Sequence, residues 1–365
     1  MLKIAVAGRY RSSSSNGVDR TIEGHLLGML ERKYEVTLLT TENPSGSDRE
    51  QLRDWGVKIE ILSSNPIRYF LACLKMRNRF DLLSLHSVFT PLNWFVSVAL
   101  GCARITTPNG GYSPKQIEYR GKSKKRIALW LYEKRMLEGA IFIQVLSENE
   151  REQLKLVAPG AQSLIVPNGF DSSLVPERKF EEPGRCLRLL FIGRVALMHK
   201  GLDILVEALG KLEAGVDWSL NIIGPAENGA IELLEGLKKN TPADVKIHFL
   251  GPIFGKEKEK YYEQSDIFVH TSRYEGMPFS VIEALSYGLP VLVTPGTNMV
   301  DLINRFDAGW TVDSDVPTVE LVSVLTADRA EFPVKGKNAQ KLVKEDLNWN
   351  VINKKIFSEV EARLK

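Results

Sequence analysis

Apolar residues along this chain gather in short runs that alternate with longer amphipathic segments. In the first half, runs rich in Val, Ile and Leu predict strands at residues 4–7, 35–39, 57–61, 81–85 and 141–145. Helices are predicted between them, most clearly at residues 20–30 and 91–100. Strands that alternate with helices form a parallel sheet with helices on both faces. The first half is therefore predicted to be a doubly wound α/β domain.

The same pattern starts again after a break. Residues 166–171 have turn chemistry, and residues 172–185 are polar with two prolines, which indicates a linker. Further strands are predicted at residues 187–192, 219–223, 246–250, 267–270 and 290–293, and the end of the chain, 338–365, is predicted to be helical. Because 365 residues exceed the usual size of one core, two domains are expected, at 1–168 and 169–345.

One segment of the second half, Glu-Gly-Met-Pro-Phe-Ser-Val-Ile-Glu, carries the most specific chemistry. Pro278 suits a first helical position, so the N–H groups of Phe279 and Ser280 are expected to point out of a helix N-terminus, where phosphates bind. Glu283, one turn into that helix, is placed to accept hydrogen bonds from a ribose, and Glu275 can reach a second polyol. This spacing favours a sugar nucleotide, whereas an isolated pair of glutamates would more often be surface charge.

Two cations follow the predicted strand 187–192. Gly193-Arg194 comes directly after the strand, and Lys200 opens the next helix. Open α/β sheets bind ligands at the carboxyl ends of their strands, where an arginine fork and a lysine together neutralise a diphosphate. The alternative is that both residues are ordinary surface charges.

These motifs together resemble the donor site of the retaining family 4 (group 1) glycosyltransferases, which have the GT-B fold. The resemblance implies two Rossmann-like domains that face each other across a cleft. The first domain would bind the acceptor and the second the nucleotide sugar, and a last helix, about residues 346–365, would return to the first domain. In this reading Glu275, Arg194 and Lys200 are catalytic: Glu275 orients the sugar hydroxyls, and the two cations stabilise the leaving diphosphate.

The activity that the resemblance implies is retaining and metal-independent. A hexose-type sugar would pass from a UDP- or GDP-sugar to a hydroxyl of a lipid-linked or cell-surface glycan. No cofactor beyond this co-substrate and no metal are expected. Residues 313–315, Asp-Ser-Asp, look like a metal-binding motif but are expected to cap a helix.

The resemblance adds sites in the first domain. His86, at the end of the strand 81–85, matches a histidine near the family's cleft and is expected to be catalytic. Asn109 stands where a histidine commonly contacts the donor sugar. Gly17 belongs to a loop that resembles the family's glycine-rich loop, although Asn16 replaces the usual first glycine. Two of these sites have a plain alternative: His86 can be an ordinary strand-end residue, and Gly17 can belong to an ordinary loop.

Three residues of the second domain complete the predicted donor-binding set. Ile253, in Gly-Pro-Ile-Phe after a strand, is expected to contact the base through backbone groups. Gly193 and Gly276 lie beside Arg194 and Glu275 in the sequence.

The charge of the chain is divided between its halves. Residues 1–170 hold 24 basic and 16 acidic residues, and within 68–135 the ratio is 13 to 3. The tract 120–132 combines five cations with an aromatic, apolar helix start, which suits an anionic membrane surface. A solvated loop followed by a core helix is the alternative, and no nucleic-acid module is evident.

Three widely spaced cysteines without metal spacing indicate reduced thiols. Together with the absence of a long apolar run or signal-peptide pattern, they favour a cytoplasmic protein with peripheral contact to the inner face of the membrane.

Two rival functions remain. A sugar-nucleotide epimerase shares the fold, but Asn109 in place of histidine disfavours its acid–base chemistry. A catalytically silent nucleotide-binding partner subunit is the other rival, which the joint presence of Arg194, Lys200, Glu275 and Glu283 disfavours.

Overall fold

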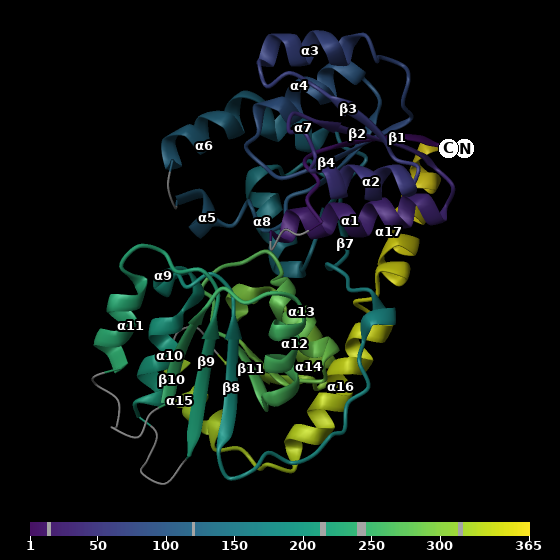
Figure 1. The fold of residues 1–365 in the computed structure, drawn as a ribbon. Coiled ribbons are helices and arrows are strands. Elements are labelled where there is room, and N and C mark those ends of the chain that lie inside the picture. Colours follow the sequence, from purple (N-terminus) through teal and green to yellow (C-terminus); the bar gives the residue numbers. More distant parts are fainter. Residues whose placement is uncertain (13–15, 119–120, 212–216, 239–245, 313–316) are drawn as a thin grey trace. The chain divides into compact units, whose positions relative to one another are not determined.

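The computed structural model describes residues 1–12, 16–118, 121–211, 217–238, 246–312 and 317–365. These residues form two compact units (Figure 1). The first unit contains Met1–Gly169 and Trp349–Lys365, and the second contains Phe170–Asn348. The first crossover between units thus falls one residue after the predicted domain end at 168.

The first unit is built on a parallel sheet with the strand order β3-β2-β1-β4-β5-β6-β7. Ile4 in the middle of the sheet pairs with Val36 on one side and Leu82 on the other. The strands are β1 (Lys3–Ala7), β2 (Glu35–Thr40), β3 (Lys58–Ile61), β4 (Leu82–His86), β5 (Ala103–Thr107), β6 (Phe142–Val145) and β7 (Ser163–Ile165).

Helices cover both faces of this sheet. One buried cluster contains side chains of α1, α2 and α17, and another contains side chains of α3, α4 and α7. The helices are α1 (Gly17–Glu31), α2 (Gly46–Asp54), α3 (Pro66–Leu74), α4 (Pro91–Leu100), α5 (Pro114–Glu118), α6 (Lys122–Ala128), the π-helical turn η1 (Leu129–Glu133), α7 (Lys134–Glu138), α8 (Glu148–Val157) and α17 (Trp349–Leu364).

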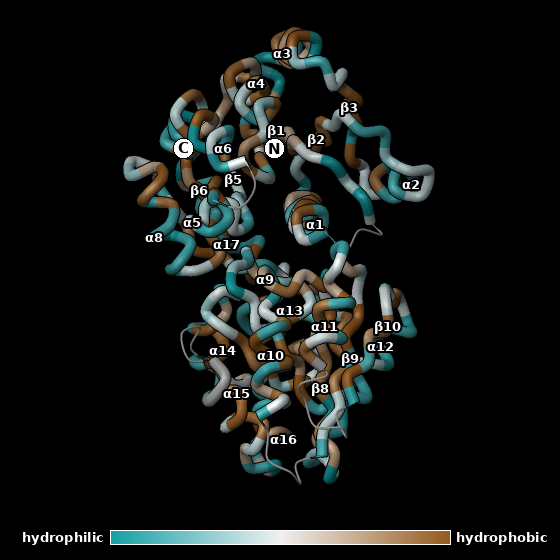
Figure 2. Tube along the Cα trace, turned by 90° about the vertical axis from the view of Figure 1, so that its left-hand side faces the viewer, coloured by the Kyte–Doolittle hydropathy of each residue, from teal (hydrophilic) through white to brown (hydrophobic). Residues whose placement is uncertain are grey.

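The second unit repeats this plan with the strand order β10-β9-β8-β11-β12-β13, again all parallel. Hydrophobic residues line its inner strands, as the brown stretches along β8 and β9 in Figure 2 illustrate. The strands are β8 (Leu187–Ile192), β9 (Trp218–Ile223), β10 (Lys246–Gly251), β11 (Ile267–His270), β12 (Val291–Val293) and β13 (Gly309–Thr311).

The helices of the second unit follow its strands in the chain. They are η2 (Ser172–Leu174, 3-10), α9 (Leu197–Lys200), α10 (Leu202–Leu209), α11 (Ala230–Lys238), α12 (Gly255–Gln264), α13 (Phe279–Ser286), η3 (Pro295–Thr297, 3-10), α14 (Val300–Phe306), α15 (Pro317–Leu325) and α16 (Glu331–Glu345). In the part of the chain that the structure describes, every helix is too short or too polar to span a membrane.

The structure corrects several sequence predictions. Strands β5, β7 and β13 were not expected, because two are three residues long and β5, Ala-Arg-Ile-Thr-Thr, is half polar. The predicted terminal helix is two helices, α16 and α17, separated at residues 346–348. Pro278 is the N-cap of α13 and not its first residue, since its ψ of 121° is extended.

Candidate functional site

The order of the strands reverses between β8 and β11 in the second unit. Because all strands are parallel, their carboxyl ends meet at one edge of the sheet, and such reversal points hold ligands in open α/β sheets. Gly193 and Arg194 follow β8 at this edge, and the loop that carries Glu275 follows β11. The predicted catalytic residues of the second unit therefore come from neighbouring central strands.

Glu275 and Lys200 form a buried ion pair at this edge. Their side chains are 14% and 11% exposed, and the hydroxyl of Ser272 donates a further hydrogen bond to Glu275 Oε1 at 3.1 Å. Burial acts to raise the pKa of Glu275, but Lys200 and His270 outweigh it and hold the pKa well below its usual range. Glu275 is therefore a carboxylate at neutral pH.

Two histidines complete the surroundings of this carboxylate. His270 Nε2 lies 3.5 Å and His199 Nε2 lies 3.7 Å from Glu275 Oε1. Burial lowers the pKa of His270 to about 4 and also lowers the pKa of His199. Near neutral pH both rings are uncharged, so Lys200 supplies the positive charge that faces Glu275.

All of these contacts reach the same oxygen of Glu275. Lys200, Ser272 and both histidines approach Oε1, and among the described residues none makes a hydrogen bond to Oε2. One oxygen is thus fixed by the protein, while the other retains its capacity to accept hydrogen bonds.

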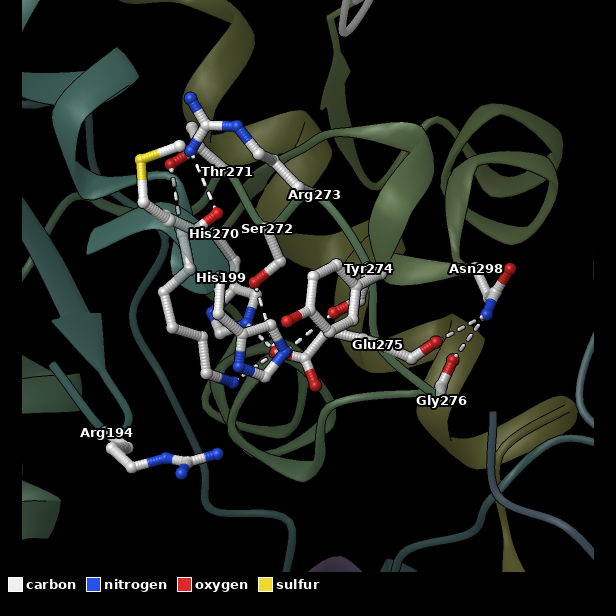
Figure 3. Close-up of polar contacts among 12 residues, drawn as sticks. Arg194, His199, His270, Thr271, Ser272, Arg273, Tyr274, Glu275, Gly276 and Asn298 are labelled. Carbon is white, nitrogen blue, oxygen red and sulfur yellow. Dashed lines mark hydrogen bonds and ion pairs between the residues drawn. The ribbon is translucent and has the colours of Figure 1, made fainter. Parts of the chain in front are cut away.

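The loop that carries Glu275 is tied down by Asn298. The Asn298 side-chain amide donates to the backbone oxygens of Glu275 at 2.9 Å and Gly276 at 2.8 Å, as Figure 3 shows. Nearer the start of the two loops, the Thr294 hydroxyl donates to the Ser272 backbone oxygen at 2.6 Å. The segment after β12 therefore holds the Glu275 loop in position at the carboxyl ends of the strands.

Two glycines allow the loops at this edge to approach each other. A Cβ at Gly201 would lie 2.0 Å from the backbone oxygen of Thr271, and one at Gly224 would lie 1.9 Å from that of Gly193. Both glycines also have positive φ, 64° and 142°. Lys200 reaches Glu275 because Gly201 lets its turn sit directly against the end of β11.

Arg194 occupies a more open position than Lys200. Its side chain is 55% exposed and its guanidinium pairs with Glu227 at 3.2 Å. Figure 3 shows Arg194 apart from the contacts drawn around Glu275. The two predicted cations thus differ in their surroundings: Lys200 is held in a buried ion pair, and Arg194 is a more exposed group that pairs with Glu227.

Glu283 is held in place on α13 by two groups that sequence reasoning missed. Lys258 Nζ lies 3.2 and 3.0 Å from its two carboxylate oxygens, and the Tyr262 hydroxyl donates to Oε2 at 2.8 Å. Lys258 and Tyr262 share one face of α12 because they are four residues apart. That spacing was readable in the sequence, but its proximity to Glu283 was not.

The other predicted donor-binding residues of this unit also lie in the segments that follow its strands. Gly193 directly follows β8, and Phe279 and Ser280 are the first two residues of α13. Ile253 is partly buried in the loop between β10 and α12.

The predicted sites of the first unit follow its own strand ends. His86 ends β4, is 3% exposed, and its ring lies 5.3 Å from the buried ring of His25. Burial, and then His25, lower the pKa of His86 well below its usual value. His86 is therefore a neutral imidazole, and no local sequence pattern indicated that His25 lies beside it.

Asn109 and Gly17 also lie at strand-to-helix connections. Asn109 has a φ of 53°, and its amide donates to the Thr107 backbone oxygen at 3.4 Å. Gly17 is the first residue of α1, and Asn16 is the N-cap, whose side chain accepts from Val18 N at 3.1 Å. Asn16 thus has a structural role that a glycine in its place would not fill.

Among the described residues, no group of three or more His, Cys, Asp or Glu side chains could hold a metal ion. The Asp-Ser-Asp motif at 313–315 lies outside the described residues.

Comparison with known proteins identifies the family of this chain. Residues 186–325 match the family model for glycosyl transferases group 1, and residues 15–174 match that for glycosyltransferase family 4. WcaL of Escherichia coli (strain K12), provisionally named a colanic acid biosynthesis glycosyltransferase, is 26% identical over 222 residues, which are 57% of this chain and 53% of WcaL. The amylovoran biosynthesis glycosyltransferase AmsD of Erwinia amylovora is 33% identical over 116 residues, 31% of each chain.

The chain spans about half the length of the curated relatives it matches. Among solved structures, Alr3699/HepE of Anabaena in complex with UDP and glucose is similar with a TM-score of 0.73 and 16% identity. The similarity covers 99% of this chain and 100% of that one, which confirms the predicted fold of two Rossmann-like GT-B domains. Both units match glycosyltransferase models, and the chain therefore belongs to the family 4 (group 1) glycosyltransferases.

Proposed function

We propose that this chain transfers a hexose-type sugar from a nucleoside-diphosphate donor, UDP or GDP, to a hydroxyl of a lipid-linked or cell-surface glycan. The transfer retains the anomeric configuration and needs no metal ion. The buried Lys200–Glu275 pair at the reversal point of the second sheet carries this proposal. A fixed carboxylate beside a fixed ammonium suits a ligand that has hydroxyls on one side and phosphates on the other.

The proposed donor site follows from the positions of its charges. Glu283 on α13 accepts hydrogen bonds from the ribose, while Glu275 Oε2 accepts them from the transferred sugar. Lys200, Arg194 and the N-terminus of α13 face the diphosphate between them. The complex of the similar Alr3699/HepE with UDP and glucose supports this choice of ligand class.

The proposed mechanism is electrostatic. As the bond between the sugar and the diphosphate breaks, negative charge grows on the leaving group, and Lys200 and Arg194 stabilise it. These cations do the work for which other enzymes use a divalent metal. By resemblance to the family, the departing phosphate takes the proton of the acceptor hydroxyl on the same face of the sugar, so Glu275 positions the sugar and forms no covalent bond.

Two further observations support the acceptor class and the location. WcaL and AmsD are both named for the biosynthesis of bacterial polysaccharides, which supports a glycan acceptor. Cys73, Cys102 and Cys186 are free thiols, which supports a reducing compartment such as the cytoplasm.

Thermal stabilisation by a panel of UDP-, GDP-, ADP- and dTDP-sugars tests the donor site. A selective rise in Tm that persists in EDTA is expected for one nucleotide, because a ligand that binds only the folded state stabilises it. The Glu283→Ala variant should lose most of this shift. No shift with any nucleotide sugar would remove the main support for the proposal.

Product analysis separates the proposed activity from its rivals. Incubation of the donor alone should yield slow hydrolysis to free sugar and nucleoside diphosphate. An isomerised nucleotide sugar would instead identify an epimerase. Tight nucleotide binding without hydrolysis, and without transfer to a panel of glycan acceptors, would identify a silent partner subunit.

A further inference from the structure

The first unit exposes an unusual set of side chains on α6 and η1. Ile127, Trp130 and Leu131 are 57%, 79% and 50% exposed, and Lys124 and Arg126 lie on the turn before them, also exposed. We call these five residues the basic–aromatic face. Tryptophan is rarely so exposed in a folded domain, because its large apolar surface is then left in contact with water.

The charged and apolar residues of this segment are inverted relative to an ordinary surface helix. Glu133, three residues after Trp130, is fully buried. Its carboxylate accepts hydrogen bonds from the Tyr112 hydroxyl at 2.6 Å and from Phe89 N at 2.5 Å. Hydrophobicity alone would place the tryptophan inside and the glutamate in water. The two hydrogen bonds to the Glu133 carboxylate stabilise the opposite arrangement, because they replace its contacts with water.

The π-helical turn explains how the inversion is built. Leu129–Glu133 forms a single π turn between α6 and α7. Its backbone hydrogen bonds join residues five apart instead of four, so the turn is wider than that of an α-helix. The wider turn brings Glu133 inward, and Tyr132 packs its ring 6.3 Å from Trp94 of α4. Trp130 and Leu131 then point into solvent from a segment that is anchored on its other side.

The charge around the exposed apolar residues is positive. Among the residues that the structure describes, no acidic side chain lies within ion-pair distance of Lys124 or Arg126. Glu118 pairs with Lys122 at 3.0 Å, and the remaining acidic residue of the segment, Glu133, is buried. The face therefore presents cations beside a tryptophan and two aliphatic side chains.

We propose that the basic–aromatic face binds the surface of an anionic lipid bilayer. Trp130, Ile127 and Leu131 enter the interface between headgroups and acyl chains, and Lys124 and Arg126 contact lipid phosphates. Single-stranded nucleic acid would use aromatic rings for stacking, but exposed Ile127 and Leu131 offer no stacking surface, which favours the bilayer. The proposal goes beyond the donor site, which lies in the other unit, and does not depend on it.

Flotation of the full chain with lipid vesicles tests this proposal. Binding is expected to vesicles that mix phosphatidylglycerol with phosphatidylcholine, but not to pure phosphatidylcholine, and to weaken as salt rises. The double variant K124S/R126S should lower the partition coefficient about thirtyfold, because each lost cation weakens binding about fivefold. The W130A variant should lower it about tenfold, because a large apolar contact is lost.

Two matched controls separate surface contact from folding. Leu156 on α8 is 77% exposed in the same unit, and L156A should bind vesicles like the unchanged protein. K337S/K341S, on exposed positions of α16 in the other unit, should also leave binding unchanged. All these variants should keep their thermal transitions and their donor-induced Tm shift, because none of these side chains supports a core or the donor site.

The fluorescence emission of Trp130 provides a second, independent test of bilayer binding. The difference spectrum between the unchanged protein and W130F should shift to shorter wavelength when anionic vesicles are added. Equal binding to neutral and anionic vesicles, or full binding by K124S/R126S and W130A, would overturn the proposal. So would a dimer in solution that W130A abolishes, or binding to single-stranded RNA with none to vesicles.

Discussion

Glu275 is the residue on which the donor site depends. Burial alone would favour its neutral form, but Lys200 and His270 keep it ionised. Among the residues that the structure describes, the hydrogen bonds and ion pairs of its carboxylate all reach Oε1. The pair is almost fully shielded from water, so each charge depends on the other. A buried charge with its partner removed is costly, which makes this pair testable by double substitution.

Replacing Glu275 with glutamine should abolish most transfer and also destabilise the protein. We expect turnover to fall on the order of 100-fold, and the free energy of unfolding to fall by about 3 kcal/mol because Lys200 stays buried without a counter-ion. Adding Lys200→Met should restore much of the stability but none of the activity. Urea unfolding and initial-rate assays measure the two effects, and unaltered turnover in Glu275→Gln would contradict the assigned role.

Glu283 should affect donor binding rather than turnover. Tyr262→Phe removes the hydroxyl that donates to Glu283 at 2.8 Å, so donor KM should rise about fivefold with kcat little changed. Glu283→Ala should raise donor KM on the order of 10- to 100-fold. The neighbouring Tyr261→Phe is the matched control, and equal effects of the two tyrosine variants would argue against a specific role for Tyr262.

At the scale of elements, the donor site is an assembly of loops at one sheet edge. The loops after β8, β9, β11 and β12 meet there, and they approach so closely that glycine is required where backbone meets backbone. Asn298 then fixes the Glu275 loop through two backbone oxygens. Helices α12 and α13 add Lys258, Tyr262 and Glu283 from the next layer.

Gly201→Ala tests the close approach of these loops. A Cβ would clash with the Thr271 backbone oxygen, and φ is positive, so we expect a loss of about 3 kcal/mol in unfolding free energy and a large loss of activity. Gly229→Ala shares a positive φ, 76°, but has no atom within 4 Å of its Cβ. It should cost about 1 kcal/mol and leave activity intact. Similar losses for both, measured by denaturant unfolding, would mean that backbone strain alone matters.

At the scale of the whole molecule, the chain is two α/β units with separate cores, and α17 belongs to the first. Trp349 begins this last helix, its ring lies 5.7 Å from His25, and the Asn353 amide donates to the Gly24 backbone oxygen at 2.9 Å. The final helix is thus part of the core of the N-terminal unit, where it contacts His25 of α1, whose ring lies beside that of His86 at the end of β4.

Those histidines should make the first unit sensitive to acid. Burial lowers the pKa of His25 from 6.5 to about 4, so the folded state stays unprotonated while the unfolded chain takes up a proton. The contribution of His25 to stability is therefore full above pH 6.5 and is lost as pH falls to 4, by about 3 kcal/mol. Glu150, whose pKa burial raises to about 7, acts with the opposite sign over an overlapping range.

The test compares how the free energy of unfolding changes with pH in His25→Leu and in the unchanged protein. Unfolding free energy should fall less steeply between pH 6.5 and 4 in His25→Leu than in the unchanged protein, while the two curves run parallel above pH 7. Identical slopes would show that His25 titrates normally in the folded state.

Much of this architecture was readable from the sequence. Apolar runs and turn residues predicted ten strands and the division near residue 168, because fully buried parallel strands are hydrophobic on both faces. The cations after the strand 187–192 predicted Arg194 and Lys200 as site candidates, and the segment at a loop-to-helix junction predicted Glu275 and Glu283. The missed strands β5, β7 and β13 are short or half polar, and their place is set by pairing with neighbours rather than by their own pattern.

The sequence by itself determined the kind of fold and the residue types at the edge of the second sheet, because both follow from the spacing of apolar runs and charged residues along the chain. Only the tertiary structure decided which charges meet. Lys200 lies 75 residues from Glu275, Lys258 lies 25 from Glu283, and Arg194 lies 33 from Glu227. Such pairings depend on strand order and on glycines that let loops touch, and no local pattern encodes either. Likewise, a π turn and two buried hydrogen bonds, not hydrophobicity, turned Trp130 outward and Glu133 inward.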